Sequence, residues 1–117
     1  MKTKLPAKAA KLLRELVGLL IEGQYEELEQ RSESTKVTAR GLSKAVDDYR
    51  RTLIELPEEG WELTDVVTLQ GSPPTRFSVR QPLWTREEGR SDLTFEATFI
   101  KVSENQFDFE INDLHVL

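Results

Sequence analysis

The chain has 117 residues, of which 38% are hydrophobic and 32% charged, as is typical of one folded domain over residues 1–117. Its formal net charge of −5 argues against nucleic acid as a partner, because phosphate binding needs a basic surface. The absence of cysteine excludes disulfides, thiolate metal ligands and a cysteine nucleophile.

The first predicted element is a helix over Pro6–Glu22, with Thr3 as N-cap and Gly23 as the stop. Its apolar stretch Leu12–Ile21 is broken by charged residues and is far too short to span a membrane. The second half of this helix is apolar on nearly all sides, so it needs partners on two sides. It is expected to lie in the mouth of a curved sheet or to contribute to a dimer contact as well.

Two further helices are predicted before the pattern changes. The second spans Tyr25–Arg31, and the third begins at the N-cap Thr38 and ends near Arg51. Apolar residues of the third helix recur at the spacing of one buried face: Leu42, Ala45, Val46, Tyr49 and Leu53.

From Thr52 onward the hydrophobic period becomes two, which predicts strands. A short strand over 53–56 ends at Pro57, and a turn follows at 58–60. Longer strands are expected over 61–70 and 76–84, separated by the turn Gly71–Pro74. Short links between consecutive strands predict an antiparallel meander.

The last quarter of the chain has the clearest alternation. Two runs, beginning at Ser91 and near Phe107, place apolar residues on one face and acidic residues on the other. The side chains expected to face the helices across the meander are all apolar except Gln81: Phe77, Val79, Leu83, Phe95, Ala97, Phe99, Phe107, Phe109 and Ile111.

The last strand changes phase near its end. Leu114 falls on the opposite parity to Ile111, so a β-bulge near Asn112 and Asp113 is needed to keep both in the core. With the bulge, Asp113 and the only histidine, His115, share the acidic face; without it, His115 points inward. A histidine beside an aspartate is a candidate general base, so both residues are weak catalytic candidates.

Asp65 is a third weak catalytic candidate. Its parity places it with Trp61, Leu63 and Val67, where it would be a buried acid or base in a pocket. The alternative is a phase slip that exposes Asp65 and turns Val66 inward.

The acidic face also predicts a binding surface. Arg76 and Arg80 are expected opposite Asp92 and Glu96, where opposite charges help to set the register. From residue 91 to 117, however, six acidic residues accompany only one lysine, an excess suited to recruiting a basic protein surface. The residues predicted to bind a partner are Trp84, Asp92, Glu96, Asp108 and Glu110.

Two resemblances add to this interpretation. Helices followed by a long meander, with the acidic element Leu20–Leu28 after the first helix, resemble the nuclear transport factor 2-like, cystatin-related cone fold. That resemblance implies a bent sheet wrapped around the helices, and functions ranging from isomerases and dehydratases to ligand carriers and interaction modules. The segments Trp84–Thr94 and Asn112–Leu117 resemble a bacterial domain family of unknown function.

The expected fold is therefore α+β, with three N-terminal helices packed on a curved four- to five-stranded antiparallel meander. The expected function is a non-enzymatic binding or protein-interaction module, without cofactor or metal. The partner is expected to be a second copy or a basic protein surface, with a small apolar ligand as a further option. The alternative is a small isomerase or hydrolase with its site between helix one and the sheet. A cytoplasmic location with no membrane contact is expected.

Overall fold

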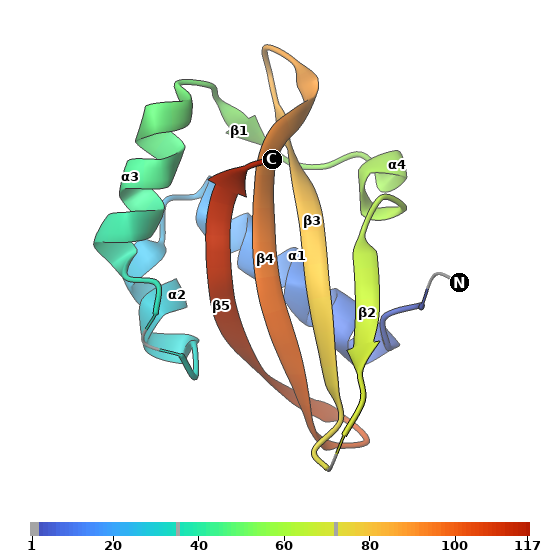
Figure 1. Ribbon diagram of the computed structural model, residues 1–117. Helices are drawn as coiled ribbons and strands as arrows, with labels where there is room; N and C mark the ends of the chain where they lie inside the picture. The colour runs from blue at the N-terminus through green and yellow to red at the C-terminus, as the bar shows by residue number, and fades with distance from the viewer. Residues whose placement is uncertain (1–2, 35, 72) are drawn as a thin grey trace.

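The computed structural model describes residues 3–34, 36–71 and 73–117. Helices α1 (Ala7–Ile21), α2 (Tyr25–Arg31) and α3 (Ala39–Tyr49) come first, and a five-stranded antiparallel sheet follows (Figure 1). The remaining elements are β1 (Leu53–Ile54), α4 (Glu58–Trp61), β2 (Asp65–Leu69), β3 (Arg76–Thr85), β4 (Gly89–Ser103) and β5 (Gln106–Val116). The predicted α+β class and the meander are confirmed.

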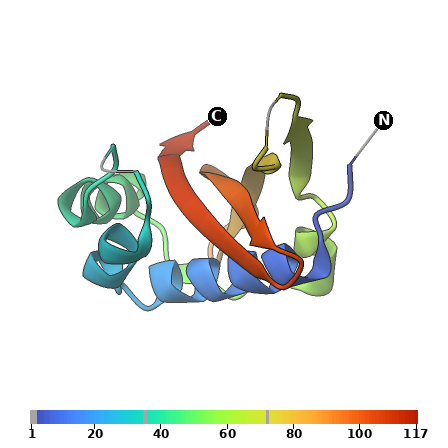
Figure 2. The same cartoon turned by 90° about the horizontal axis from the view of Figure 1, so that it is seen from below.

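The strands form a sheet with β3 and β4 at its centre. Strand β4 pairs with β3 and β5, while β1 and β2 both pair with the other side of β3 at its two ends. Helix α1 crosses one face of this sheet, and α2 and α3 lie beyond the β5 edge (Figures 1 and 2). Among the described residues, no helix covers the opposite face, which we call the open face (Figure 1).

The space between α1 and the sheet is filled by apolar side chains. Leu13, Leu16 and Leu20 of α1 and Phe95 and Phe99 of β4 are at most 2% exposed. Burying each such side chain contributes roughly 1.5–3 kcal/mol. The predicted inward set is therefore confirmed as buried core, except that Phe107 is only partly buried.

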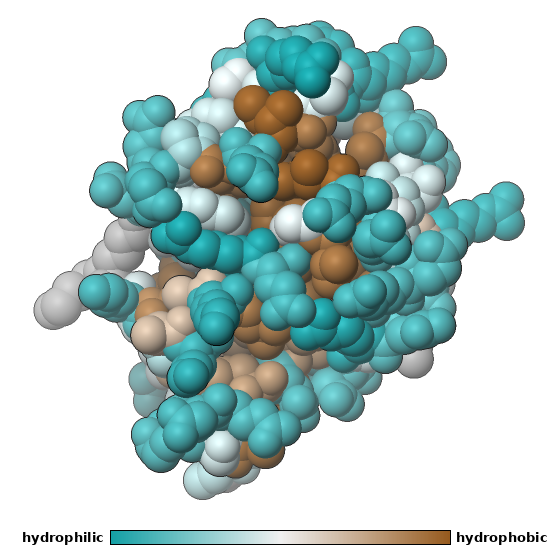
Figure 3. Space-filling view, turned by 180° about the vertical axis from the view of Figure 1, so that it is seen from behind, coloured by the Kyte–Doolittle hydropathy of each residue, from teal (hydrophilic) through white to brown (hydrophobic). Residues whose placement is uncertain are grey.

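The outer side of α1 is less completely covered. Leu12, Leu19 and Ile21 are partly buried and pack against the core. Seen from behind, this side of the molecule shows apolar side chains among hydrophilic ones (Figure 3). As predicted, α1 carries apolar side chains on more than one side.

The helix ends follow their local sequence. Thr38 caps α3 as predicted, because its Oγ1 accepts a hydrogen bond from the Gly41 amide at 3.0 Å. The Thr3 cap is wrong: α1 begins at Ala7 after Pro6, whose fixed φ suits a helix start, and no side chain caps it. Gly23 ends the first helix in the left-handed region, at φ 74°.

The segment between β1 and β2 differs from the prediction. Residues 58–61 form the one-turn helix α4 after Pro57, and the strand predicted from residue 61 begins only at Asp65. Gln81, fully buried, holds α4 on the sheet because its Nε2 donates to the Gly60 carbonyl at 3.0 Å. The predicted strand over 53–56 is likewise reduced to the two residues of β1.

The tip of the β3–β4 hairpin is tied to the end of α3 and to β1. The Thr52 amide donates a hydrogen bond to the Glu87 carboxylate at 2.8 Å, and the Thr52 hydroxyl donates a second one at 2.9 Å. The hydrogen bond from the amide is the main cause that lowers the pKa of the Glu87 carboxyl. The Tyr49 hydroxyl donates to Glu88 at 2.9 Å and accepts from the Asp92 amide at 3.1 Å. These contacts fix the start of β4 relative to the helices.

Candidate functional site

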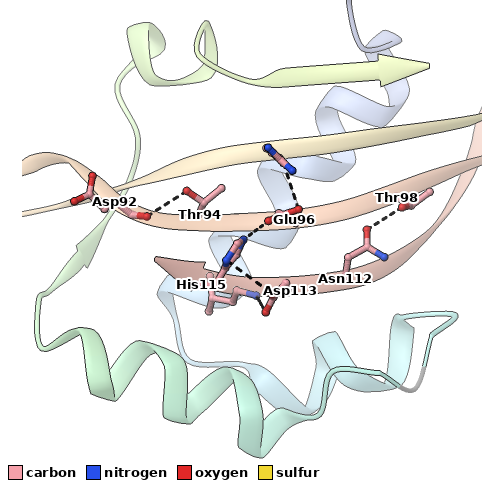
Figure 4. Close-up of polar contacts among 9 residues, drawn as sticks. Asp92, Thr94, Glu96, Thr98, Asn112, Asp113 and His115 are labelled. Atoms are coloured by element: carbon pink, nitrogen blue, oxygen red, sulfur yellow. Dashed lines mark hydrogen bonds and ion pairs between the residues drawn. The ribbon is translucent and has the colours of Figure 1, made fainter. Parts of the chain in front are cut away.

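A β-bulge in β5 determines which residues occupy the open face. Ile111 pairs with Ala97 and Asp113 pairs with Glu96, so Asn112 is an extra residue between two registers. Ile111 and Leu114 are consequently both buried. The predicted bulge is confirmed, and it places Asp113 and His115 beside the outward residues of β4 (Figure 4).

A row of charged residues crosses the open face at the level of the bulge. The cross-strand partners are Asp65 of β2, Arg80 of β3, Glu96 of β4 and Asp113 of β5, in that order. Successive partners in an antiparallel sheet place their side chains on one face, within reach of each other. We call this set, together with His115, the charged row.

Glu96 is the centre of the charged row. Arg80 Nε lies 3.4 Å from Glu96 Oε1, and His115 Nε2 contacts Glu96 Oε2 (Figure 4). Because an ionised carboxylate only accepts hydrogen bonds, the Nε2 of His115 is the donor in this contact. His115 Nδ1 also lies 3.8 Å from Asp113 Oδ2. The Glu96 side chain is only 20% exposed, so these partners offset its partial loss of water.

The outward positions on either side of the charged row carry the other carboxylates predicted to bind a partner. Asp108 pairs with Ile100 and Glu110 pairs with Thr98, both on the side of the charged row nearer the β4–β5 turn. Asp92 is exposed near the opposite end of β4 (Figure 4). The four predicted binding carboxylates thus lie along the outward positions of β4 and β5.

One predicted pairing is wrong. Arg80 lies opposite Glu96 as expected, but Arg76 pairs with Ile100 and not with Asp92. The reason is that β4 extends to Ser103, well beyond the alternating run, so the start of β3 meets the end of β4. Arg76 therefore neutralises none of the four binding carboxylates directly across the β3–β4 pair.

Trp84 lies apart from these carboxylates. It is partly buried, and a Cβ at Gly60 would come within 3.0 Å of its ring, so the ring packs directly on α4. It pairs with Ile54 of β1 and with Arg90 of β4. The ring is therefore held against α4 and is only partly available to a partner.

The three weak catalytic candidates all lie on the open face. Asp65 is exposed and Val66 is 5% exposed, so the phase slip was the correct alternative. A histidine that donates to a carboxylate has the orientation of a general base. The groove between α1, α4 and β2 and the pocket between α2 and α3 include none of these three side chains in their linings.

The described residues contain neither a cluster suited to a metal ion nor a helix suited to a membrane span. No group of three or more His, Asp or Glu side chains there has metal-binding geometry. No helix in the described part of the chain combines the length and the apolar character needed to cross a bilayer.

Comparison with known proteins assigns a family. Residues 17–117 match the family described as "Domain of unknown function (DUF7668)", and the chain belongs to this family. The match begins within α1 and covers the whole sheet, including the open face. No curated protein and no solved structure matches the chain.

Proposed function

We propose that this protein is a non-enzymatic binding module that recognises a basic segment of a partner protein through the open face of its sheet. The observation that carries the proposal is the alignment of Asp92, Glu96, Asp108 and Glu110 on a face that no described helix covers. Complementary charge on two proteins speeds their encounter and disfavours wrong partners.

The carboxylates have different roles in this proposal. Asp92, Asp108 and Glu110 have no side-chain ion pair with another described residue, so lysine or arginine side chains of a partner can pair with them. Glu96 is already held by Arg80 and His115, so it fixes the shape of the surface. Trp84 contributes at most its exposed edge, and its part in binding stays a prediction.

Neutralising the open face tests the proposal. The variant carries Asp92→Asn, Asp108→Asn and Glu110→Gln, and the control carries Glu22→Gln, Glu26→Gln and Asp47→Asn on the helical side. Both lose three negative charges, so a general charge effect changes them equally. Proteins cross-linked to each in extract of the native host are identified by mass spectrometry, and the proposed surface is located by the cross-linked residues.

We expect the open-face variant to lose a basic partner that the control and the unchanged protein retain. Binding of the isolated partner should also weaken steeply with salt, because the contacts are between exposed charges. Equal cross-linking by both variants, or cross-links that avoid β4 and β5, would contradict the proposal.

The finer sequence predictions, on the fold family, the oligomeric state and the location, are further proposals. A cone fold of the nuclear transport factor 2-like kind is supported by the packing of α1 against one face of a twisted sheet. A homodimer is supported by the partly covered apolar side of α1, and a cytoplasmic location by the lack of cysteine.

The alternative function, a small isomerase or hydrolase, has the His115–Glu96 contact in its favour, but its site would be on the open face and not inside the cone.

A further inference from the structure

The two edges of the sheet differ in how many of their backbone groups are hydrogen-bonded by other described residues. Along the β5 edge, the Ile111 amide donates to Ser32 Oγ at 2.9 Å, and the Phe109 carbonyl accepts from the Glu33 amide at 2.8 Å. The Leu114 amide donates to the side chain of Asp113 at 2.8 Å. These groups would otherwise be free to pair with a foreign strand, so the β5 edge is blocked.

The β2 edge has no comparable protection. Strand β2 pairs with β3 on one side, and on its other side the described residues make no hydrogen bond to it. Val67 is 54% exposed and Leu69 is 42% exposed. An open strand edge that carries exposed apolar side chains is a template for an added strand.

An apolar groove runs beside this open edge. It encloses about 430 Å³ between residues 3–5, α1, α4 and the start of β2. The N-terminal segment and β2 stand side by side at this end of the molecule (Figures 1 and 2). The apolar part of the lining comes from all four elements: Leu5, Ala10, Leu13, Trp61 and Val66.

The edge and the groove together match the side-chain alternation of a strand. An added strand would lie about 4.8 Å from β2, with successive side chains on opposite faces of the sheet. One set would lie beside Val67 and Leu69 on the open face. The other set would point toward Val66 and Trp61, into the groove.

Charge around the groove indicates the occupant. Glu58, Glu59, Glu62 and Asp65 lie on α4, directly after it and at the start of β2, four carboxylates against the two basic residues that line the groove, Lys4 and Arg14. Arg14 forms a two-point ion pair with Glu58, at 3.0 and 3.1 Å, and holds the pKa of that carboxyl below its usual range. A strand antiparallel to β2 ends at this acidic corner, so a basic residue near its C-terminal end is complementary to it.

A second copy of this chain fits the site less well. Strand β2 of that copy and the residue on either side of it, 64–70, contain no basic residue to meet the acidic corner. Two five-residue strands also share only about 17 Å of edge, a contact much smaller than a stable dimer interface.

We infer that the β2 edge and its groove bind an extended peptide segment of a partner protein, as an additional antiparallel strand. The segment has apolar residues at alternate positions and a basic residue near its C-terminal end. This site is separate from the acidic open face of β4 and β5, so either proposal can fail without the other.

Two synthetic octapeptides of identical composition test the inference. Both are acetylated and amidated: Thr-Val-Thr-Val-Thr-Val-Lys-Lys, and its reversal, Lys-Lys-Val-Thr-Val-Thr-Val-Thr. Each is titrated into nitrogen-15-labelled protein and followed by amide chemical shifts. The first peptide should bind saturably, shift the amides of residues 3–5 and 64–69, and bind at least about threefold more tightly than the reversal.

Two matched protein variants test whether the peptide occupies the groove. Ala10→Phe places a ring in the groove and should weaken binding about tenfold or more, whereas Ala7→Phe, on the same helix but outside the groove, should not. Unchanged spectra elsewhere verify the fold of both variants. The inference is overturned if neither peptide binds saturably, if the shifts avoid β2, or if Ala10→Phe binds normally. Concentration-dependent self-association that only Ala10→Phe abolishes would also overturn it, in favour of a second copy.

Discussion

The two faces of strand β4 show how one segment serves two purposes. Its odd-numbered residues from Leu93 to Phe99 are at most 1% exposed and pack in the core against α1. The even-numbered Glu96 instead joins a network of charged groups on the open face. Because neighbouring side chains point in opposite directions, stability and charge chemistry can be changed separately along this strand.

The largest expected difference is between two neighbours in β4. Phe95→Ala removes a fully buried ring and should lower the free energy of unfolding by about 3–5 kcal/mol. Glu96→Gln keeps the volume and loses only partly exposed ion pairs, so its cost should be under about 1 kcal/mol. Urea denaturation followed by tryptophan fluorescence measures both. Similar losses for the two variants would mean that the open face contributes to the fold as much as the core does.

A second prediction concerns the end of the sheet that α4 closes. Gly60→Ala introduces a Cβ about 3.0 Å from the Trp84 ring and 3.2 Å from Leu56, so either α4 or the ring must move. We expect a loss of about 1–3 kcal/mol, as for other overpacked sites. Gly41→Ala is the control, because its Cβ would meet only the Thr38 hydroxyl, at 3.4 Å. Thermal unfolding of both variants, with no loss for Gly60→Ala, would show that this contact is not tight.

The contrast between the two faces of β4 also explains which features could be predicted from the sequence. Alternation in β4 and β5 is set by burial of one face, so the core residues, the carboxylates and the bulge followed from parity alone. The start of β2 at Asp65 was harder to predict, because Trp61 and Leu63 continue the alternation although they lie in α4 and in the turn after it. Counting parity from Trp61 therefore placed Asp65 on the buried face, and only the alternative of a phase slip gave its observed exposure.

The groove was beyond sequence reasoning for a different reason. Its lining joins residues 3–14 of the first helix region to residues 58–66, and no local pattern links two segments so far apart. The unprotected β2 edge is likewise a property of the assembled sheet. The one local signal was the pair Val67 and Leu69, apolar residues in a strand whose inward positions are Val66 and Thr68.

A smaller effect is expected from the histidine of the charged row. His115→Gln removes the ring that contacts Glu96 but leaves the ion pair with Arg80. Both side chains are partly exposed, so the free energy of unfolding should change by less than about 1 kcal/mol. Arg80→Gln, measured in the same denaturation series, removes the other partner of Glu96. A loss several times larger for His115→Gln would show that the histidine contributes to packing and not only to charge.

The smallest effect is expected from deleting Asn112, the extra residue of the bulge. Without it, Asp113 can still pair with Glu96 and Leu114 can still face the core, because the two registers of β5 then join without a shift. The loss of the 2.8 Å hydrogen bond from Thr98 to Asn112 is offset by a regular ladder, so stability should change by no more than about 0.5 kcal/mol.

Deleting Glu110 provides the opposing control for the same loss of length. It removes a residue before the bulge, so Ile111 must move to the open face or the bulge must relocate. Turning Ile111 out of the core should cost about 2 kcal/mol or more. Amide spectra should retain both the Phe99–Phe109 pairing and the Ala97–Ile111 pairing only in the Asn112 deletion. Equal tolerance of both deletions would mean that burial does not fix the parity of β5, and the separation of the two faces would then depend on the charged row itself.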